Sequence, residues 1–176
     1  MRPNTAKSEN DKLEALSSLR VRIINDLFVE QWRDVWFFPE RDGVRGWQGA
    51  QDIIFVALNP SYGGGSASKA FNSFYQELRL NGFMNAHLTD ISKVRARGKE
   101  VKQVLQDAAL MDKQKLYLLE EIDIIQPRLL VPMGKRTTEA LQQWLPRSKV
   151  SGPSRTMRPD FQRKRTGASS PWLCVR

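Results

Sequence analysis

The chain has 176 residues, of which 40% are hydrophobic and 27% charged, a composition typical of a soluble globular protein with room for one core. Its single cysteine, Cys174, excludes a disulfide framework and any zinc or iron–sulphur site held by cysteines of one chain. The net charge of +9 favours a polyanionic partner such as nucleic acid, although a basic tail that only aids solubility would give the same excess.

The N-terminal stretch, M-R-P-N-T-A-K-S-E-N, is polar and lacks the apolar centre of a secretory signal. No apolar run approaches the length that crosses a bilayer, so we expect no membrane partner and a cytoplasmic location. Residues 11–38 show apolar side chains at helical spacing and then an aromatic cluster closed by Pro39. This pattern predicts an N-terminal helical extension over residues 1–40, packed on the main body through its aromatic residues.

An unbroken apolar run at residues 53–58 predicts a strand that is covered on both faces, as parallel strands are. It runs directly into Asn59-Pro60, and a loop rich in glycine and serine follows. The three consecutive glycines of this loop lack the Lys-Ser/Thr pair of a phosphate loop, so a flexible connection is the simpler interpretation. Asn59 either ends the strand in a local turn or places its side chain in a functional site.

The rest of the chain up to residue 145 alternates between helical and strand patterns. Helices are predicted at residues 70–80, 100–125 and 135–145, and strands at residues 86–91 and 129–132. This alternation predicts an α/β fold with a parallel sheet. We expect three layers, α/β/α, around a central and mainly parallel four-stranded sheet.

The predicted α/β domain covers residues 41–151, and its fourth strand begins at residues 149–151. From residue 152 the periodicity fails, and basic residues alternate with turn residues. Residues 152–176 are therefore predicted to form an irregular, basic C-terminal tail.

Ligands of parallel α/β sheets gather at the carboxyl ends of the strands. Here those ends lead to Asn59, to Asp90 with the basic loop that follows it, and to Lys135. We predict that the three ends form one pocket with a cationic lip. His87, the only histidine, lies among apolar neighbours and fits a packed core residue better than a catalytic triad. No cluster of metal ligands is visible, so neither a metal nor a cofactor is expected.

Four segments in order within residues 52–145 resemble motifs of the uracil-DNA glycosylase superfamily. The run F-V-A-L-N-P-S is similar to the first motif, especially in the mismatch-specific branch. The run K-A-F-N-S-F-Y-Q-E-L follows where the family places an aromatic residue, and L-T-D-I-S-K-V-R-A-R-G-K resembles T-N-x-x-K-x-R-P-x-G. The run L-L-E-E-I-D-I-I-Q-P-R-L-L-V-P-M-G-K resembles the family's helix-strand-helix segment.

The resemblance implies a DNA glycosylase that hydrolyses the N-glycosidic bond of an extruded uracil or related damaged base in DNA, acting as a monomer. Asn59 would position the attacking water, Phe71 and Tyr62 would contact the base, and Asp90 or Asn85 would read its edge. Phosphate contacts would come from Lys93, Arg95, Arg97, Lys99, Lys135, Ser154 and Arg155. Core packing for Phe71 and a solvated face for the basic loop remain open alternatives.

Two positions depart from the family pattern. Asp90 stands where the family usually has asparagine, and an ionised carboxylate can only accept hydrogen bonds, so it would meet O4 of uracil with like charge unless it is protonated. In the last motif, Gly152-Pro153-Ser154-Arg155 stands where the family has His-Pro-Ser or Asn-Pro-Ser, and Gly152 has no side chain to polarise the base. The alternative is a catalytically inactive nucleic-acid-binding relative with the same fold.

Overall fold

The structure is a computed structural model that describes residues 7–30, 32, 34–60, 69–96 and 99–145, with only the backbone of residues 69–71. The predicted fourth strand and the predicted basic tail lie outside these residues. The elements are α1 (Glu9–Val29), the 3-10 turn η1 (Gly46–Gln48), β1 (Ile53–Ala57), α2 (Lys69–Leu80), β2 (His87–Asp90), α3 (Glu100–Gln106), α4 (Ala108–Ile125), β3 (Leu129–Pro132) and α5 (Lys135–Trp144).

The described strands form one parallel sheet in the order β2-β1-β3, which confirms the α/β fold class. In the register of this sheet Ala57 faces Asp90 on one side, and Val56 faces Pro132 on the other. The central strand, β1, is almost wholly buried, as its unbroken apolar sequence predicts. The first and last residues of the strands therefore align at two opposite edges of the sheet.

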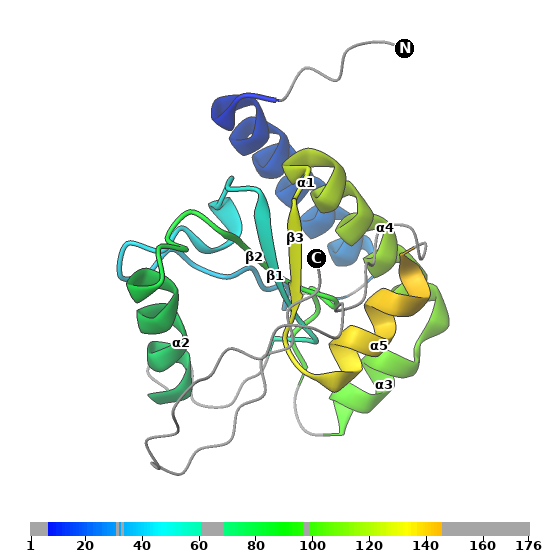
Figure 1. Ribbon diagram of the computed structural model, residues 1–176. Coiled ribbons are helices and arrows are strands. Elements are labelled where there is room, and N and C mark those ends of the chain that lie inside the picture. Colours follow the sequence, from blue (N-terminus) through cyan, green and yellow to red (C-terminus); the bar gives the residue numbers. More distant parts are fainter. Residues whose placement is uncertain (1–6, 31, 33, 61–68, 97–98, 146–176) are drawn as a thin grey trace.

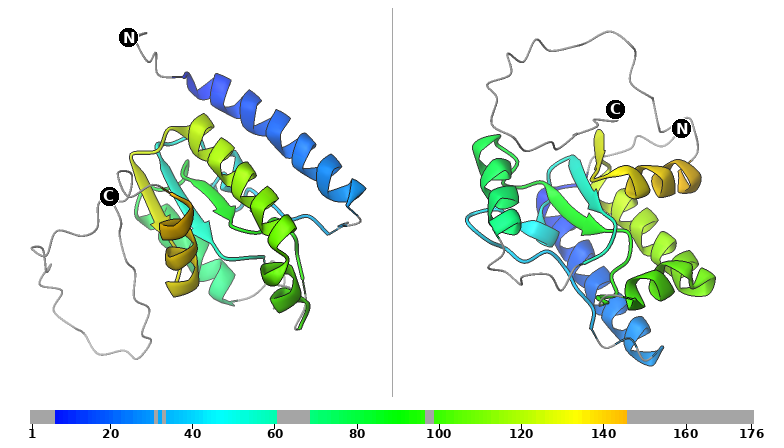
Figure 2. Two further views of the ribbon diagram at one scale, coloured as in Figure 1. Left: turned by 90° about the vertical axis from the view of Figure 1, so that its right-hand side faces the viewer. Right: turned by 90° about the horizontal axis from the view of Figure 1, so that it is seen from below.

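Side chains of β1 pack into two separate core clusters, because successive side chains of a strand point to opposite sides. Phe55 lies in a core cluster with Tyr75 and Leu78 of α2, whereas Ile54 and Val56 lie in a second cluster with α1, α4 and α5. Figure 1 shows α2 alone on one side of the strands and the other helices across from it, and both views of Figure 2 agree.

Helix α1 begins in a capping box, in which the Ser8 hydroxyl accepts from the Asp11 backbone N–H and the Asp11 carboxylate accepts from the Ser8 N–H. Its buried side chains recur at helical spacing and belong to the same core as those of β1 and α4; they are Leu16, Leu19, Ile23 and Leu27. The division into segments 1–40, 41–151 and 152–176 stays a prediction.

The prediction that helix extends to residue 38 is wrong, because α1 ends at Val29. The chain turns after it, where the Trp32 N–H donates to the Leu27 carbonyl at 2.8 Å, and Val35 then forms an antiparallel bridge with Val94. The Trp36 N–H donates to the Lys93 carbonyl at 2.9 Å, and the Arg95 N–H donates to the Asp34 carbonyl at 2.8 Å. The pairing partner is about sixty residues away in sequence, so helical periodicity could not reveal it.

The predicted helix over residues 100–125 is two helices, α3 and α4, separated at Asp107. Asp107 has extended backbone, and its carboxylate accepts a hydrogen bond from the Leu110 N–H at 3.0 Å, so it caps the start of α4. The break turns α3 away from α4 and places it beside the carboxyl edge of the sheet.

Replacing Gly49 by alanine is expected to destabilise the fold by about 1–3 kcal/mol or more. Gly49 follows η1, and a Cβ there would lie 2.0 Å from the Ala86 carbonyl oxygen, which is backbone just before β2. The two segments would have to separate, moving Trp47 off His87, whose rings are now 4.8 Å apart. Denaturant unfolding of the variant measures the loss.

Gly82→Ala is the matched control for this prediction. Gly82 lies two residues after α2 with φ +77, and a Cβ there meets nothing within 4 Å. Only the backbone strain of a left-handed alanine remains, about 1–2 kcal/mol. Equal losses at positions 49 and 82 would contradict a steric role for Gly49.

Candidate functional site

The carboxyl ends of the three strands meet at one edge of the sheet. Beyond the strands, the Ile91 N–H donates to the Ala57 carbonyl at 2.8 Å and the Ser92 N–H to the Leu58 carbonyl at 3.1 Å. On the other side of β1, the Met133 N–H donates to the Val56 carbonyl at 2.7 Å. These bonds hold the segments after β1, β2 and β3 next to one another, at the position where α/β sheets bind ligands.

Asn59 lies two residues beyond β1 at this edge and is half-buried. Ala57 packs in the cluster of α2 and Leu58 in the cluster of α4, and the chain bends at Leu58 and Asn59, just after the strand. Its amide Nδ2 donates to the Pro60 carbonyl at 3.2 Å. This local bond fits the turn interpretation of Asn59.

Asp90 is the last residue of β2 and is 2% exposed. Leu88, two residues earlier, packs in the cluster of α2, so Asp90 lies on the α2 side of the sheet. Its Oδ1 has no hydrogen-bond partner among the residues that the structure describes. Burial, partly offset by the Lys93 ammonium and reinforced by the Glu121 carboxylate, raises the pKa of Asp90 to about 7.

A buried polar network lies on the opposite side of β2 and joins it to α4. Glu121 Oε1 pairs with the Lys93 ammonium at 2.9 Å, and Glu121 Oε2 lies 3.1 Å from His87 Nε2. The Lys93 ammonium also donates to the Thr89 hydroxyl at 2.8 Å and to the Asp90 carbonyl. Burial alone would raise the pKa of Glu121, but Lys93 and His87 outweigh it and hold the pKa below its usual value.

The network fixes the backbone on which Asp90 sits. The Gln114 amide oxygen accepts a hydrogen bond from the Lys93 backbone N–H at 2.9 Å, so α4 holds the chain on both sides of Asp90. His87 is wholly buried and bonded to Glu121, which confirms the interpretation of a packed core histidine. Sequence reasoning missed Glu121 and Gln114, which lie seven residues apart on one face of α4.

Two predicted site residues lie elsewhere. The prediction of Lys93 on a phosphate-binding lip is wrong, because its side chain is 1% exposed and enclosed by the network. Asn85 precedes β2 and so lies at the opposite edge of the sheet from Asn59. Its amide oxygen accepts a hydrogen bond from the Ala50 N–H at 3.1 Å, so Asn85 has a structural role. The prediction that Asn85 reads the base is therefore wrong.

Three of the predicted cationic residues are described in positions that solvent can reach. Lys99 is exposed where α3 begins, and the Lys135 side chain is 88% exposed in the first turn of α5, 3.8 Å from Glu139. The half-buried Arg95 lies over the Trp36 ring, 4.3 Å from its centroid. Position 71 lies in the first turn of α2, but its side chain is outside the described residues, as are Tyr62, Arg97, Ser154 and Arg155.

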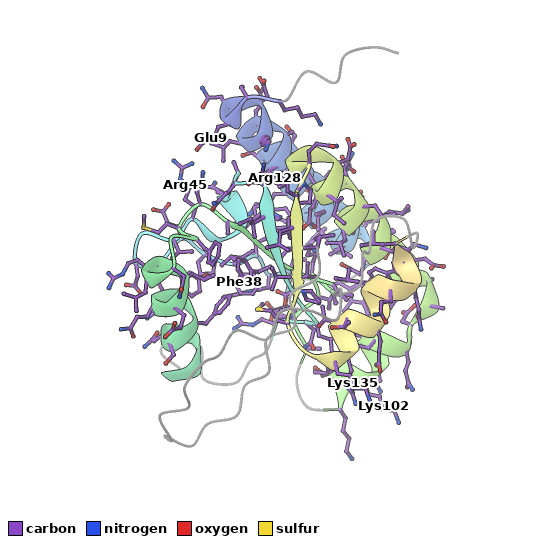
Figure 3. The ribbon with its side chains drawn as sticks, viewed as in Figure 1. Glu9, Phe38, Arg45, Lys102, Arg128 and Lys135 are labelled. Carbon is purple, nitrogen blue, oxygen red and sulfur yellow. The ribbon has the colours of Figure 1, made fainter. Side chains whose placement is uncertain are left out.

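An open pocket of about 720 Å³ lies at the same edge, between α3 and α5. Leu58 and Ile91 line it together with Met111 and Trp144, all of the core cluster of α1, α4 and α5, so it opens on the opposite side of the sheet from Asp90. Two cations that sequence reasoning missed, Lys102 and Arg136, also line this pocket. Figure 3 labels Lys102 on α3 and Lys135 on α5. Lys102 and Arg136 could have been found in the sequence, because both lie in the first turn of a helix that starts at the carboxyl edge.

The described residues contain no group of three histidine, cysteine, aspartate or glutamate side chains able to hold a metal ion. Within the same residues, every helix is too short or too polar to span a bilayer. Neither a scan against protein-family models nor a search of curated proteins finds a match to this chain.

Proposed function

We propose that this chain is a DNA glycosylase of the uracil-DNA glycosylase type, which hydrolyses the N-glycosidic bond of an extruded uracil or related damaged base. The observation that supports this most is the convergence of three parallel strand ends, with Asn59 and Asp90 at the same edge of the sheet. A base must leave the duplex before its glycosidic bond can be cut, and such an edge offers it polar groups beside apolar walls.

In this proposal Asn59 holds the attacking water and stabilises the sugar cation through its amide dipole. An amide is a poor base, so its contribution is orientation and electrostatic preorganisation and does not involve proton abstraction. Asp90 reads the edge of the base, and Phe71 and Tyr62 contribute stacking, which is worth roughly 1–3 kcal/mol per base. The chemistry would need neither a metal nor a cofactor.

The DNA backbone would run along the carboxyl edge, where the exposed cations gather. Lys99, Lys102, Lys135 and Arg136 come from the first turns of two helices that start there. The first turn of α5 contains no acidic residue, so its positive helix end adds to the attraction for phosphates. Arg97, Ser154 and Arg155 complete the proposed DNA contacts.

We propose further that the fold has three layers, α/β/α, with a fourth parallel strand beginning at residues 149–151. We also propose that the protein is a monomer and is located in the cytoplasm. A second candidate function is nucleic-acid binding without catalysis. The hydrogen bond from the Asn59 amide to the Pro60 carbonyl favours it, because that bond alone is sufficient reason for an asparagine at this turn.

Asn59→Ala is expected to lower the single-turnover rate of uracil excision from duplex DNA by about 10²–10³-fold, the usual effect of removing one preorganised donor. Asn25→Ala, at an exposed position of α1, is the matched control and should retain the wild-type rate. Cleavage of the uracil-containing strand after alkaline treatment measures the rate.

If the wild-type protein and the Asn59→Ala variant both give only background cleavage, the enzyme proposal is wrong. Salt-dependent binding of both proteins to undamaged DNA would then support the second candidate, because phosphate contacts release counterions whether or not a base is cut.

A further inference from the structure

The Asp90 carboxyl is a buried polar group at the carboxyl edge, and one of its oxygens is unpaired among the described residues. Native proteins pair nearly all their buried polar atoms, so an unpaired one calls for an explanation. Asp90 is 2% exposed, and its Oδ1 has no hydrogen-bond partner among the described residues. A ligand group that docks against it would supply the missing partner.

Charged neighbours surround Asp90 but are occupied elsewhere. The Lys93 ammonium, from the segment after β2, is bound by Glu121 of α4 and Thr89 of β2, and it reaches Asp90 only at the backbone carbonyl. Glu121 adds like charge, and it is also paired with His87. On the opposite side, the Tyr75 hydroxyl of α2 donates to the Pro39 carbonyl at 2.8 Å. None of these groups forms an ion pair with the Asp90 carboxyl in the described structure.

The protonation state of Asp90 follows from this environment. Burial opposes the ionised form, Lys93 favours it and Glu121 opposes it again, with the result that burial raises the pKa of Asp90 to about 7. The group therefore changes charge within the physiological range. A neutral carboxyl offers one O–H donor and one carbonyl acceptor, whereas a carboxylate offers acceptors only.

We infer that Asp90 is a specificity-determining residue that reads the extruded base as a neutral acid, and that its ionisation closes the site to uracil. The neutral carboxyl matches a base edge that sets one acceptor beside one donor: its O–H donates to O4 of uracil, and its carbonyl oxygen accepts from N3–H. The carboxylate matches instead an edge with two adjacent N–H donors, as in guanine. This inference rests on the proposed function and adds a pH-dependent selection of the base.

The test compares wild type with Asp90→Asn, whose amide has the same donor and acceptor at every pH. Single-turnover excision of uracil is measured from pH 5.5 to 8.5. We expect the wild-type rate to fall towards tenfold per pH unit above pH 7, and the Asp90→Asn rate to stay constant there. Asp112→Asn, at an exposed position of α4, should follow the wild type. Identical pH profiles of wild type and Asp90→Asn would overturn the inference.

Binding of free uracil separates this inference from the proposed function, because it needs no cleavage. We expect uracil to bind the wild-type protein more weakly at pH 8.5 than at pH 6 by about tenfold or more, and to bind Asp90→Asn equally at both. That result without any cleavage would refute the glycosylase proposal and retain Asp90 as the reader. In ¹³C NMR of the wild type, the chemical shift of the carboxyl carbon reports whether Asp90 is ionised. A shift showing an ionised carboxylate down to pH 5 would overturn the inference by itself.

Discussion

Glu121→Leu is expected to lower the free energy of unfolding by about 3–5 kcal/mol, because it leaves the Lys93 ammonium charged and without its carboxylate in the core. The two side chains are 0% and 1% exposed, so water cannot replace the lost partner. Lys93→Met should cost a similar amount, because it leaves the Glu121 carboxylate with only His87 and Thr89 as described side-chain partners. Urea unfolding at pH 7 measures both losses.

The double variant, Lys93→Met with Glu121→Leu, is expected to be more stable than either single variant. Methionine and leucine have shapes close to those of the residues they replace, and neither buries a charge, so most of the desolvation cost disappears. Some loss remains because His87 Nε2 loses the carboxylate 3.1 Å away.

A neighbouring exposed pair provides the control. Arg22 pairs with Glu120, the residue before Glu121, and their side chains are 51% and 42% exposed. Removing either partner there should cost no more than about 1 kcal/mol, because water solvates the remaining charge. Additive losses at Lys93 and Glu121 in the double variant would contradict the view that the two charges stabilise each other.

Asp90→Asn is expected to become progressively more stable than the wild type as the pH rises from about 4 to about 7. Burial raises the pKa of Asp90 from 3.8 to about 7 in the folded protein. Below pH 3.8 both folded and unfolded chains hold a neutral carboxyl, and nothing is lost. Between the two values the unfolded chain ionises first, so wild-type stability falls as the pH rises, and above about 7 the loss is constant.

The full difference corresponds to at most on the order of 4 kcal/mol, from the change of pKa between 3.8 and about 7. Denaturant unfolding of wild type, Asp90→Asn and the exposed control Asp112→Asn at pH 4.5, 6 and 8 measures it. Parallel stability curves for wild type and Asp90→Asn would show that Asp90 ionises freely in the folded chain.

The α/β fold class and the position of each strand could be predicted from the sequence, because both depend on local patterns. The unbroken apolar run of β1 and the alternation of helices with strands require a covered parallel sheet, whatever the details of packing. The same rule predicts that Asn59, Asp90 and Lys135 meet at one edge, since parallel strands align their carboxyl ends.

Only the tertiary structure decided which polar residues are buried. In the sequence, Lys93 looks like any lysine of a basic loop, and its burial depends on Glu121, which is twenty-eight residues away and carried past it by α4. Asn85 and Asp90 are five residues apart, yet a strand between them puts them at opposite edges. The end of α1 likewise depends on the pairing of Val35 with Val94.

The sequence by itself determined where the three described strands lie, that they run parallel and which residues follow them at one edge, since these depend on side-chain periodicity and chain direction. The charge and role of each polar residue at that edge were decided by the tertiary structure. A carboxyl or an ammonium takes its protonation state and its partners from the groups packed around it, and those groups come from distant parts of the chain.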